Sequence, residues 1–296
     1  MFPKTKTMPL LIAIALSVSS CSSSTDEPKD EPAQSTRDIK VSVLDYSPAP
    51  GQFVNTLPEY ADGDTQATMA RKATESLNDK RLVTLGAWGG SITLKLAEPI
   101  INVKGKPDLK ILGNAITTSA EPGIIYVMTD TNGDGIPNEE WIEIKPECHD
   151  KARLNISVTY SRADATATAD NFIPWKSNDG NNGFLNRPPQ HATNPMFPSW
   201  VKAESITFTG CMLPDNAIYN EVTGQYTLAP YTNCADSYPN SDSRAAIDLD
   251  DAIDSSGDKI NVTHIDFIKI VTGILKCNGA LGECSTEVMG VQALNQ

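Results

Sequence analysis

Alternating apolar and polar residues dominate the chain after Lys80 and predict a series of short β-strands. Ile92-Thr93-Leu94-Lys95-Leu96 shows the period of two that places successive side chains on opposite faces of a sheet. Strand-like segments separated by turn residues recur at 39–46, 82–88, 91–103, 108–116, 123–130, 139–145, 154–162, 205–213 and 264–275. This succession predicts an all-β protein, built as an antiparallel β-sandwich.

Two segments depart from the strand pattern. Residues 65–79 carry Met69, Ala73 and Leu77 at a spacing of four, which predicts one short helix with Asp64 or Thr65 as its N-cap. Residues 163–200 are rich in Asn, Pro and Gly and predict a long loop. Because long loops inside a compact domain are often functional, this segment is a candidate ligand site.

The chain begins with a leader, residues 1–20, in which Lys4 and Lys6 precede the apolar run 10–18. That run is too short to span a bilayer and is typical of a cleaved signal peptide. The next residues, Val18-Ser19-Ser20-Cys21, resemble a bacterial lipobox, which implies that cleavage exposes Cys21 for acylation and leaves the protein anchored to a membrane. The alternative is a secretory signal that a cysteine follows by chance.

Residues 21–38 are polar, charged and proline-containing, and they predict a disordered tether ahead of one β-sandwich domain at 39–296. Serines and acids directly after Cys21 resemble the surface-export signals of Bacteroidetes lipoproteins. The formal net charge of −13 argues against nucleic acid as a partner. It favours neutral or cationic partners, or bound divalent cations.

Six cysteines are present, and removing Cys21 for lipidation leaves an odd number. Cys277 and Cys284 flank turn residues and predict a disulfide-closed hairpin, and Cys211 with Cys234 is the next candidate pair. Cys148 is then the unpaired thiol. The sequence has no CxxC motif, so it suggests neither a zinc site nor a redox dithiol.

The segment 130–141 is the sharpest candidate for metal binding. Its opening, D-x-N-x-D-G, is shared with EF-hand calcium loops, but Trp141 stands where such a loop needs a bidentate Glu. We therefore predict a calcium loop within a β-hairpin, and a metal-free polar turn is the alternative. The candidate ligands are Asp130, Asn132, Asp134, Ile136, Glu139 and Glu140. A second acidic segment, 248–254, favours a solvated turn.

Tryptophans mark the candidate recognition surface. Trp175 lies in the long segment 163–200 beside Asn178, Asp179 and Asn181, and Trp88 lies in a glycine-flanked turn. Aromatic faces beside amides suit stacking on sugars or on another flat ligand. The alternative is that each tryptophan packs in the core, which we prefer for Trp200.

No HExxH, GxSxG, Walker or GxGxxG motif occurs in the sequence. A dispersed catalytic triad and a pair of glycosidase carboxylates stay open, because neither needs adjacent residues. No two acidic residues are singled out by the pattern, so we expect a protein that is not an enzyme.

Several stretches together resemble a family of Bacteroidetes cell-surface lipoproteins, named "cell surface protein" or "PKD domain-containing protein". They lie at 48–60, 85–96, 113–144, 265–270 and 281–288. The glycine-rich strand followed by 106–115 also looks like a galactose-binding-like jelly roll, a fold common in carbohydrate-binding and adhesion modules. Glu283 and Glu287 fit the family pattern, and their role is open.

The resemblance implies a jelly-roll β-sandwich facing outward from the outer membrane. We expect a non-catalytic binding module for a glycan or another nutrient, accessory to a TonB-dependent transporter, with cobalamin as one candidate ligand. An adhesion or structural surface protein is the second hypothesis. A hydrolase of surface glycans is the third.

Overall fold

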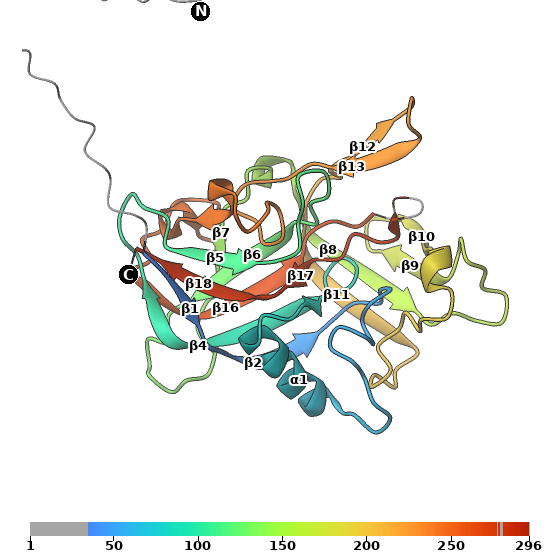
Figure 1. The fold of residues 1–296 in the computed structure, drawn as a ribbon, viewed down its shortest axis with the longest axis horizontal. Coiled ribbons are helices and arrows are strands. Elements are labelled where there is room, and N and C mark those ends of the chain that lie inside the picture. Colours follow the sequence, from blue (N-terminus) through green and yellow to red (C-terminus); the bar gives the residue numbers. More distant parts are fainter. Residues whose placement is uncertain (1–34, 277, 279–280, 296) are drawn as a thin grey trace, which may run out of the picture. The chain divides into compact units, whose positions relative to one another are not determined.

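A six-stranded antiparallel sheet forms the centre of the described structure, and its strand order is β15-β7-β6-β16-β4-β2 (Figure 1). The strands are β2 (Val41–Ser47), β4 (Ser91–Ile101), β6 (Gly123–Met128), β7 (Ile142–Ile144), β15 (Ala252–Ile253) and β16 (His264–Thr272). The period of two decides the faces: Ile92 and Leu94 of β4 enter the core, and Lys95 lies on the other side. The computed structural model describes residues 35–276, 278 and 281–295, so the predicted signal peptide, Cys21 and the tether up to residue 34 lie outside it.

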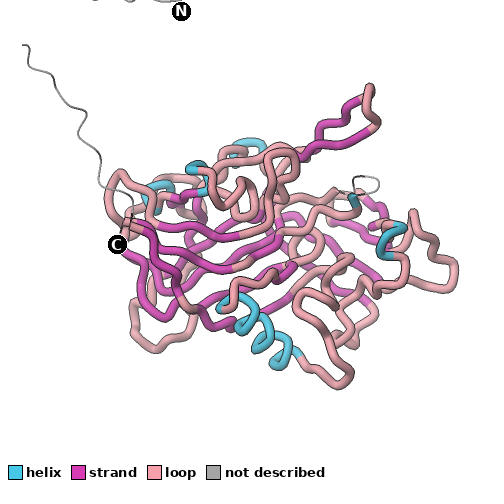
Figure 2. The backbone as a smooth tube through the Cα atoms, viewed as in Figure 1, coloured by secondary structure: helices cyan, strands magenta, loops and turns pink. Residues whose placement is uncertain are grey.

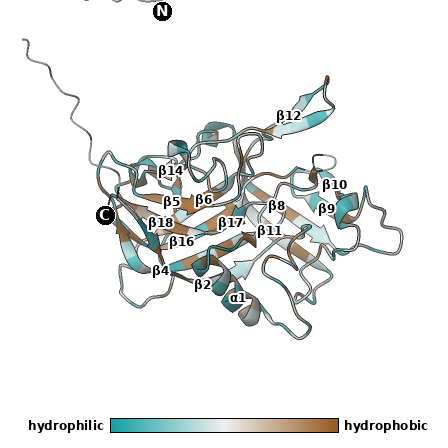
Figure 3. Cartoon of the chain, viewed as in Figure 1, coloured by the Kyte–Doolittle hydropathy of each residue, from teal (hydrophilic) through white to brown (hydrophobic). Residues whose placement is uncertain are grey.

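A four-stranded sheet of order β1-β18-β5-β14 packs its buried residues into the same core. Its strands are β1 (Thr36–Ile39), β5 (Leu109–Leu112), β14 (Ala246–Ile247) and β18 (Gly290–Leu294). Ile111 and Val291 join Ile268 and Ile270 of β16 in one apolar cluster. Figure 3 shows the hydrophobic colouring concentrated on these strands. The two sheets therefore enclose one sandwich core.

One α-helix covers part of this core, as predicted (Figure 2). Helix α1 (Gln66–Asn78) buries Met69, Ala73 and Leu77, and the Thr65 side chain caps it by accepting a hydrogen bond from the Thr68 N–H. The spacing of four thus places one apolar stripe against strand β2.

A second four-stranded sheet has its own core and corrects one prediction. Its order is β10-β9-β8-β11, from β8 (Arg153–Ser161), β9 (Ile173–Ser177), β10 (Asn182–Leu185) and β11 (Ser205–Met212). The hairpin β9–β10 lies inside 163–200, so the prediction of a loop over that whole range was wrong. Pro174, Asn182 and Gly183 interrupt the strand pattern of the hairpin, and pairing of β9 with β8 supplies the order that local sequence lacks.

The remaining strands form two short pairs, β3 (Val83–Thr84) with β17 (Glu287–Val288) and β12 (Ala217–Asn220) with β13 (Gln225–Leu228). The β12–β13 hairpin projects from the body (Figure 1). The 3₁₀ turns are η1 (His149–Lys151), η2 (Pro189–His191), η3 (Ser243–Ala245) and η4 (Leu249–Asp251). The Asp248 side chain caps η4, in agreement with the turn predicted at 248–254. The all-β class and the antiparallel sandwich are confirmed, and the jelly-roll connectivity stays a prediction.

We expect Leu94→Ala to lower the free energy of unfolding by about 2–5 kcal/mol, because it leaves a cavity between the sheets. Leu94 is 0% exposed, and Leu154 on β8 is 55% exposed. Leu154→Ala is the matched control and should change stability by less than about 0.5 kcal/mol. Urea unfolding of both variants measures the difference, and equal losses would contradict the assigned core.

Candidate functional site

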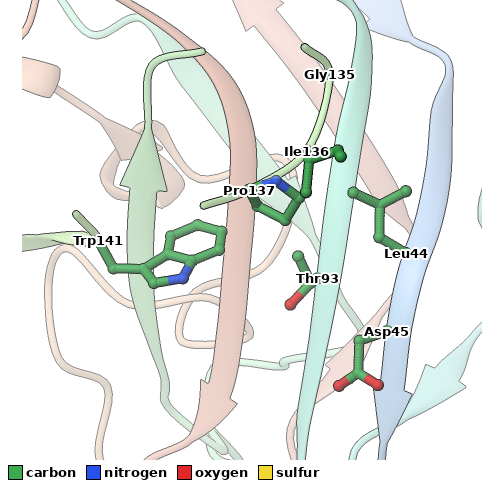
Figure 4. A pocket seen from close by; sticks show the side chains of 7 residues that line it. All are labelled: Leu44, Asp45, Thr93, Gly135, Ile136, Pro137 and Trp141. Carbon is green, nitrogen blue, oxygen red and sulfur yellow. The ribbon is translucent and has the colours of Figure 1, made fainter. Parts of the chain in front are cut away.

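A groove of about 430 Å³ lies on the outer side of the six-stranded sheet, where a loop crosses strands β2 and β4. Its lining residues are Leu44, Asp45, Thr93, Gly135, Ile136, Pro137 and Trp141. Figure 4 shows Trp141 at one side and Leu44 with Asp45 at the other, with Pro137 and Ile136 between them. The groove therefore combines one indole, aliphatic walls and a carboxylate.

A β-bulge in β2 builds one side of the groove. The register between β2 and β4 shifts between Val43 and Asp45, which leaves Leu44 as the extra residue. Leu44 and Asp45 are consecutive, yet both are exposed, and a regular strand would have buried one of them. Asp45 then pairs with Thr93 of β4, so the carboxylate and the hydroxyl lie side by side at the groove.

The loop between β6 and β7 builds the opposite wall, and its own acidic residues hold its shape. Asp130 accepts hydrogen bonds from the Asp134 N–H (3.1 Å) and the Gly135 N–H (2.9 Å). Asn132 Oδ1 also accepts from the Asp134 N–H at 2.8 Å. Gly135 has φ of +73°, a conformation that a side chain disfavours. These turns present Ile136 to the groove.

Two contacts fix this loop to the sheet beneath it. Lys95 Nζ donates to the Gly135 carbonyl at 3.2 Å, and its ammonium lies 5.9 Å from the centre of the Phe267 ring. Asp266 Oδ2 accepts a hydrogen bond from the Asp130 N–H at 2.8 Å. Strands β4 and β16 thereby hold the groove wall in place.

The predicted calcium ligands converge on the N–H groups of their own loop. Glu139 accepts from the N–H groups of Thr131 (3.0 Å) and Asn132 (3.2 Å). The hydrogen bond from the Ile136 N–H has the largest effect on Asp134, and that from the Asn138 amide has the next largest. Both lower the pKa of Asp134 and keep its carboxylate charged. The Ile136 carbonyl accepts from the Asn138 N–H, and Glu140 is exposed. Spare carboxylate lone pairs make the set compatible with a hard cation. Calcium in this loop stays a prediction.

Trp175 lies on strand β9 rather than in a loop, and its ring covers Gly183 of the paired strand. A Cβ on Gly183 would stand 2.8 Å from the indole Cζ2 atom, so one face of this ring is already used. Asn178 bonds to the Ser157 N–H and the Asn155 carbonyl. These bonds tie the turn of the β9–β10 hairpin to strand β8.

Asp179 and Asn181 serve the same turn. The Ser177 hydroxyl, with a smaller effect of Arg153, lowers the pKa of Asp179, and the Asn181 carbonyl accepts from the Ser177 N–H at 2.8 Å. Hence Asn178, Asp179 and Asn181 stabilise the hairpin and are not gathered around Trp175.

Trp88 belongs to the core, which corrects its assignment to a recognition surface. Its side chain is 0% exposed, and its indole N–H donates to the Cys211 carbonyl at 3.2 Å. Glycines around it allow close chain approach: a Cβ on Gly89 would collide with the side chain of Phe208. The segment 86–90 is therefore a tightly packed part of the core. Trp200 is buried as well, at 7% exposure, as predicted.

The predicted disulfides are not formed among the described residues. Cys148, Cys211, Cys234 and Cys284 are buried free thiols, so the Cys211–Cys234 pairing was wrong. Cys284 is unbridged, and its expected partner Cys277 lies outside the described residues. Burial raises the pKa of Cys148 to about 11 and that of Cys211 to about 12. These thiols pack as small apolar side chains beside Ile124 and Ile274.

A second group of acidic side chains lies inside the domain, with Asp236 and Glu287 buried and Glu121 partly buried. Glu121, Asp236 and Glu287 each place a carboxylate oxygen within 4.8 Å of the others. The sequence singled out Glu287, whereas Glu121 and Asp236 lie in turn-rich segments without a local signal. The sequence analysis also did not identify Trp141 and Asp45 as groove residues. It considered Trp141 only as a departure from the EF-hand pattern.

The chain matches no protein-family model, and it matches no curated protein. In the part that the structure describes, no helix is long and apolar enough to cross a membrane.

Gly135→Ala should loosen the groove wall, because it forces a side chain into φ of +73° and displaces the Lys95 ammonium from the Gly135 carbonyl. Gly133→Ala is the matched control: its φ is +71°, and no atom lies within 4 Å of the added Cβ. Each should lose about 1–2 kcal/mol from backbone strain, and Gly135→Ala about 1 kcal/mol more for the lost hydrogen bond. Urea unfolding and hydrogen exchange of the loop amides measure this. Equal effects would show that Lys95 does not hold the wall.

Proposed function

We propose that the chain is a lipid-anchored, surface-exposed protein of the outer membrane that binds its ligand without catalysing a reaction. The observation that carries this proposal is the groove between Trp141 and Asp45. A half-buried indole in one groove with a carboxylate and a hydroxyl suits a sugar, whose C–H face would stack on the ring while its hydroxyls bond to Asp45 and Thr93. A glycan is therefore the ligand class that we favour.

The groove supports binding over hydrolysis. Asp45 is the one carboxylate among its lining residues. Glycoside hydrolysis generally uses two carboxylates placed on either side of the scissile bond. The walls are also held by hydrogen bonds within the loop and to the sheet, which favours a pre-formed recognition surface.

The nutrient-uptake role rests on the sequence resemblance. A tethered binding domain beside a TonB-dependent transporter would raise the local concentration of a glycan, or of cobalamin, near the entrance of the transporter. The predicted calcium loop would add a structural ion beside the groove.

A second function, adhesion, is favoured by the projecting β12–β13 hairpin. Val222 at its tip is 96% exposed, and Ile218 and Tyr219 are 59% and 53% exposed. The Tyr219 and Tyr226 rings lie 4.9 Å apart across the hairpin. An exposed apolar tip of this kind suits contact with another macromolecule.

Trp141→Ala should weaken glycan binding several-fold to about tenfold, because an aromatic stacking contact contributes roughly 0.5–1.5 kcal/mol. The matched control is Trp175→Ala, which removes a half-buried indole from a different sheet. A panel of soluble oligosaccharides and cobalamin, measured by calorimetry, gives the affinities. A ligand that still binds the Trp141→Ala variant but no longer binds the Trp175→Ala variant would place the site at the β9–β10 hairpin. Self-association without any ligand would favour adhesion, and glycan turnover would favour a hydrolase.

Cys21→Ala should abolish lipidation and release the protein from membranes, because the thiol of Cys21 is the predicted acylation site. Ser22→Ala is the neighbouring control and should stay membrane-bound. Detergent partitioning and metabolic labelling with a fatty acid report the result. Unchanged partitioning of the Cys21→Ala protein would contradict the anchor.

A further inference from the structure

The groove on the six-stranded sheet has a single charged lining residue, and that residue lacks a cationic partner. Asp45 is the one charged side chain among the residues that line it. The Ser47 hydroxyl donates to Asp45 Oδ2 at 2.9 Å. Among the described residues, no lysine, arginine or histidine forms an ion pair with this carboxylate. The groove therefore presents a negative charge that a ligand can neutralise.

A hydroxyl lies next to this charge. Asp45 is exposed because of the bulge at Leu44, and its cross-strand partner on β4 is Thr93. Directly opposed residues of an antiparallel pair have Cβ atoms about 4.5–5.5 Å apart. Since both side chains line the groove, one ligand ring can contact the carboxylate and the hydroxyl together.

The rest of the groove is apolar. Leu44 and Ile136 are 42% and 56% exposed, and Pro137 and the indole of Trp141 complete the lining together with Gly135. Figure 4 shows Trp141 at one side of the groove and Leu44 with Asp45 at the other. A ligand that spans the groove therefore meets an aromatic face at one end and a carboxylate at the other. Apolar walls strengthen a charge interaction by excluding water.

The charges that border the groove are mostly negative. Lys95 of β4 is a nearby cation, but its Nζ donates to the Gly135 carbonyl at 3.2 Å and lies 5.9 Å from the centre of the Phe267 ring. Its charge therefore serves the groove wall. The segment 129–141 contains no lysine, arginine or histidine, and its acidic residues are Asp130, Asp134, Glu139 and Glu140. Such a border attracts a cationic ligand and repels an anionic one.

An amino sugar matches all of these features on one ring. Its C–H face suits the indole of Trp141, its ammonium group suits Asp45, and its hydroxyls suit Thr93. A lysine side chain carries its charge at the end of an apolar stem and has no hydroxyl to offer to Thr93. The lining thus favours a sugar over a cationic peptide.

We propose that the groove binds glycans that carry a free primary amine, with the ammonium group at Asp45 and the ring on Trp141. This assignment rests on the proposed glycan-binding function and narrows it to amino sugars that are not N-acylated. Asp45 is then the residue that determines specificity. Neutral sugars bind more weakly through Trp141 and Thr93, and uronic or sulfated sugars are disfavoured by charge.

The first test compares glucosamine oligosaccharides with their N-acetylated counterparts of equal length, by calorimetry on the full chain at constant Ca²⁺ concentration. N-acetylation removes the charge and keeps the ring. The natural protein should prefer the amine form by about three- to tenfold, the range expected for one partly exposed charge pair. Asp45→Asn should abolish this preference and retain binding of the N-acetylated sugar, which also reports that the variant folds.

Asp170→Asn is the matched control for total charge. Asp170 is an exposed residue between β8 and β9 and does not line the groove, so this variant should keep the preference for the amine. Equal affinities of the natural protein for the two sugars would overturn the proposal, as would a preference that Asp45→Asn retains. If Trp141→Ala still weakened both sugars, the proposed glycan-binding function would stand without it. If no glycan bound, both would fail.

The second test measures the preference for the amine at 0.1 M and at 1 M salt. The screening length falls from about 10 Å to about 3 Å over this range, so the preference should shrink while binding of the N-acetylated sugar stays constant. A preference that persists at 1 M salt would show that charge does not carry it, and the proposal would fail. An oligolysine peptide that bound more tightly than the amino sugar, and depended on Asp45, would assign the groove to a cationic peptide instead.

Discussion

Burial of the inner face of the six-stranded sheet is the constraint on which the remaining structure depends. Strand β16 pairs with β4 on one side and β6 on the other, and its Ile268 and Ile270 enter the core between the sheets. Because side chains alternate, Lys269 and Val271 must then lie on the opposite face. A slip of one residue would exchange these faces. The outward position of residues in the regular strands, such as Thr93 at the groove, therefore follows from the packing of the inner ones.

The outward face acquires its chemistry from local departures from regular structure. The bulge at Leu44 brings two consecutive side chains of β2 to the surface, and the acidic loop lays Ile136 beside them. Polar side chains in this loop act first as structural elements, since they satisfy N–H groups that no strand pairs. An acidic, turn-forming sequence can thus shape an apolar wall without itself contacting a ligand.

Acidic residues play two physically different roles in this chain. In the exposed loop, N–H donors lower the pKa of Asp134 and water screens its charge. In the interior, Asp236 and Glu287 lie beside each other with burial raising the pKa of both. An ionised carboxylate is inexpensive in the first setting and costly in the second, so burial favours the protonated form of the interior carboxyl groups. Net charge alone does not distinguish these settings.

Short-range pattern by itself determined the all-β class, the strands predicted within 91–103 and 264–275, and the capped helix predicted within 65–79. Each depends on side-chain periodicity or on a cap within one turn, and these are properties of neighbouring residues. Only the tertiary structure decided that Trp88 is buried, that Trp175 covers Gly183, that Cys211 and Cys234 are not bridged, and that Trp141 and Asp45 line one groove. It also brought Glu121 and Asp236 to Glu287. These outcomes depend on contacts between residues far apart in the chain, for which local composition carries no signal.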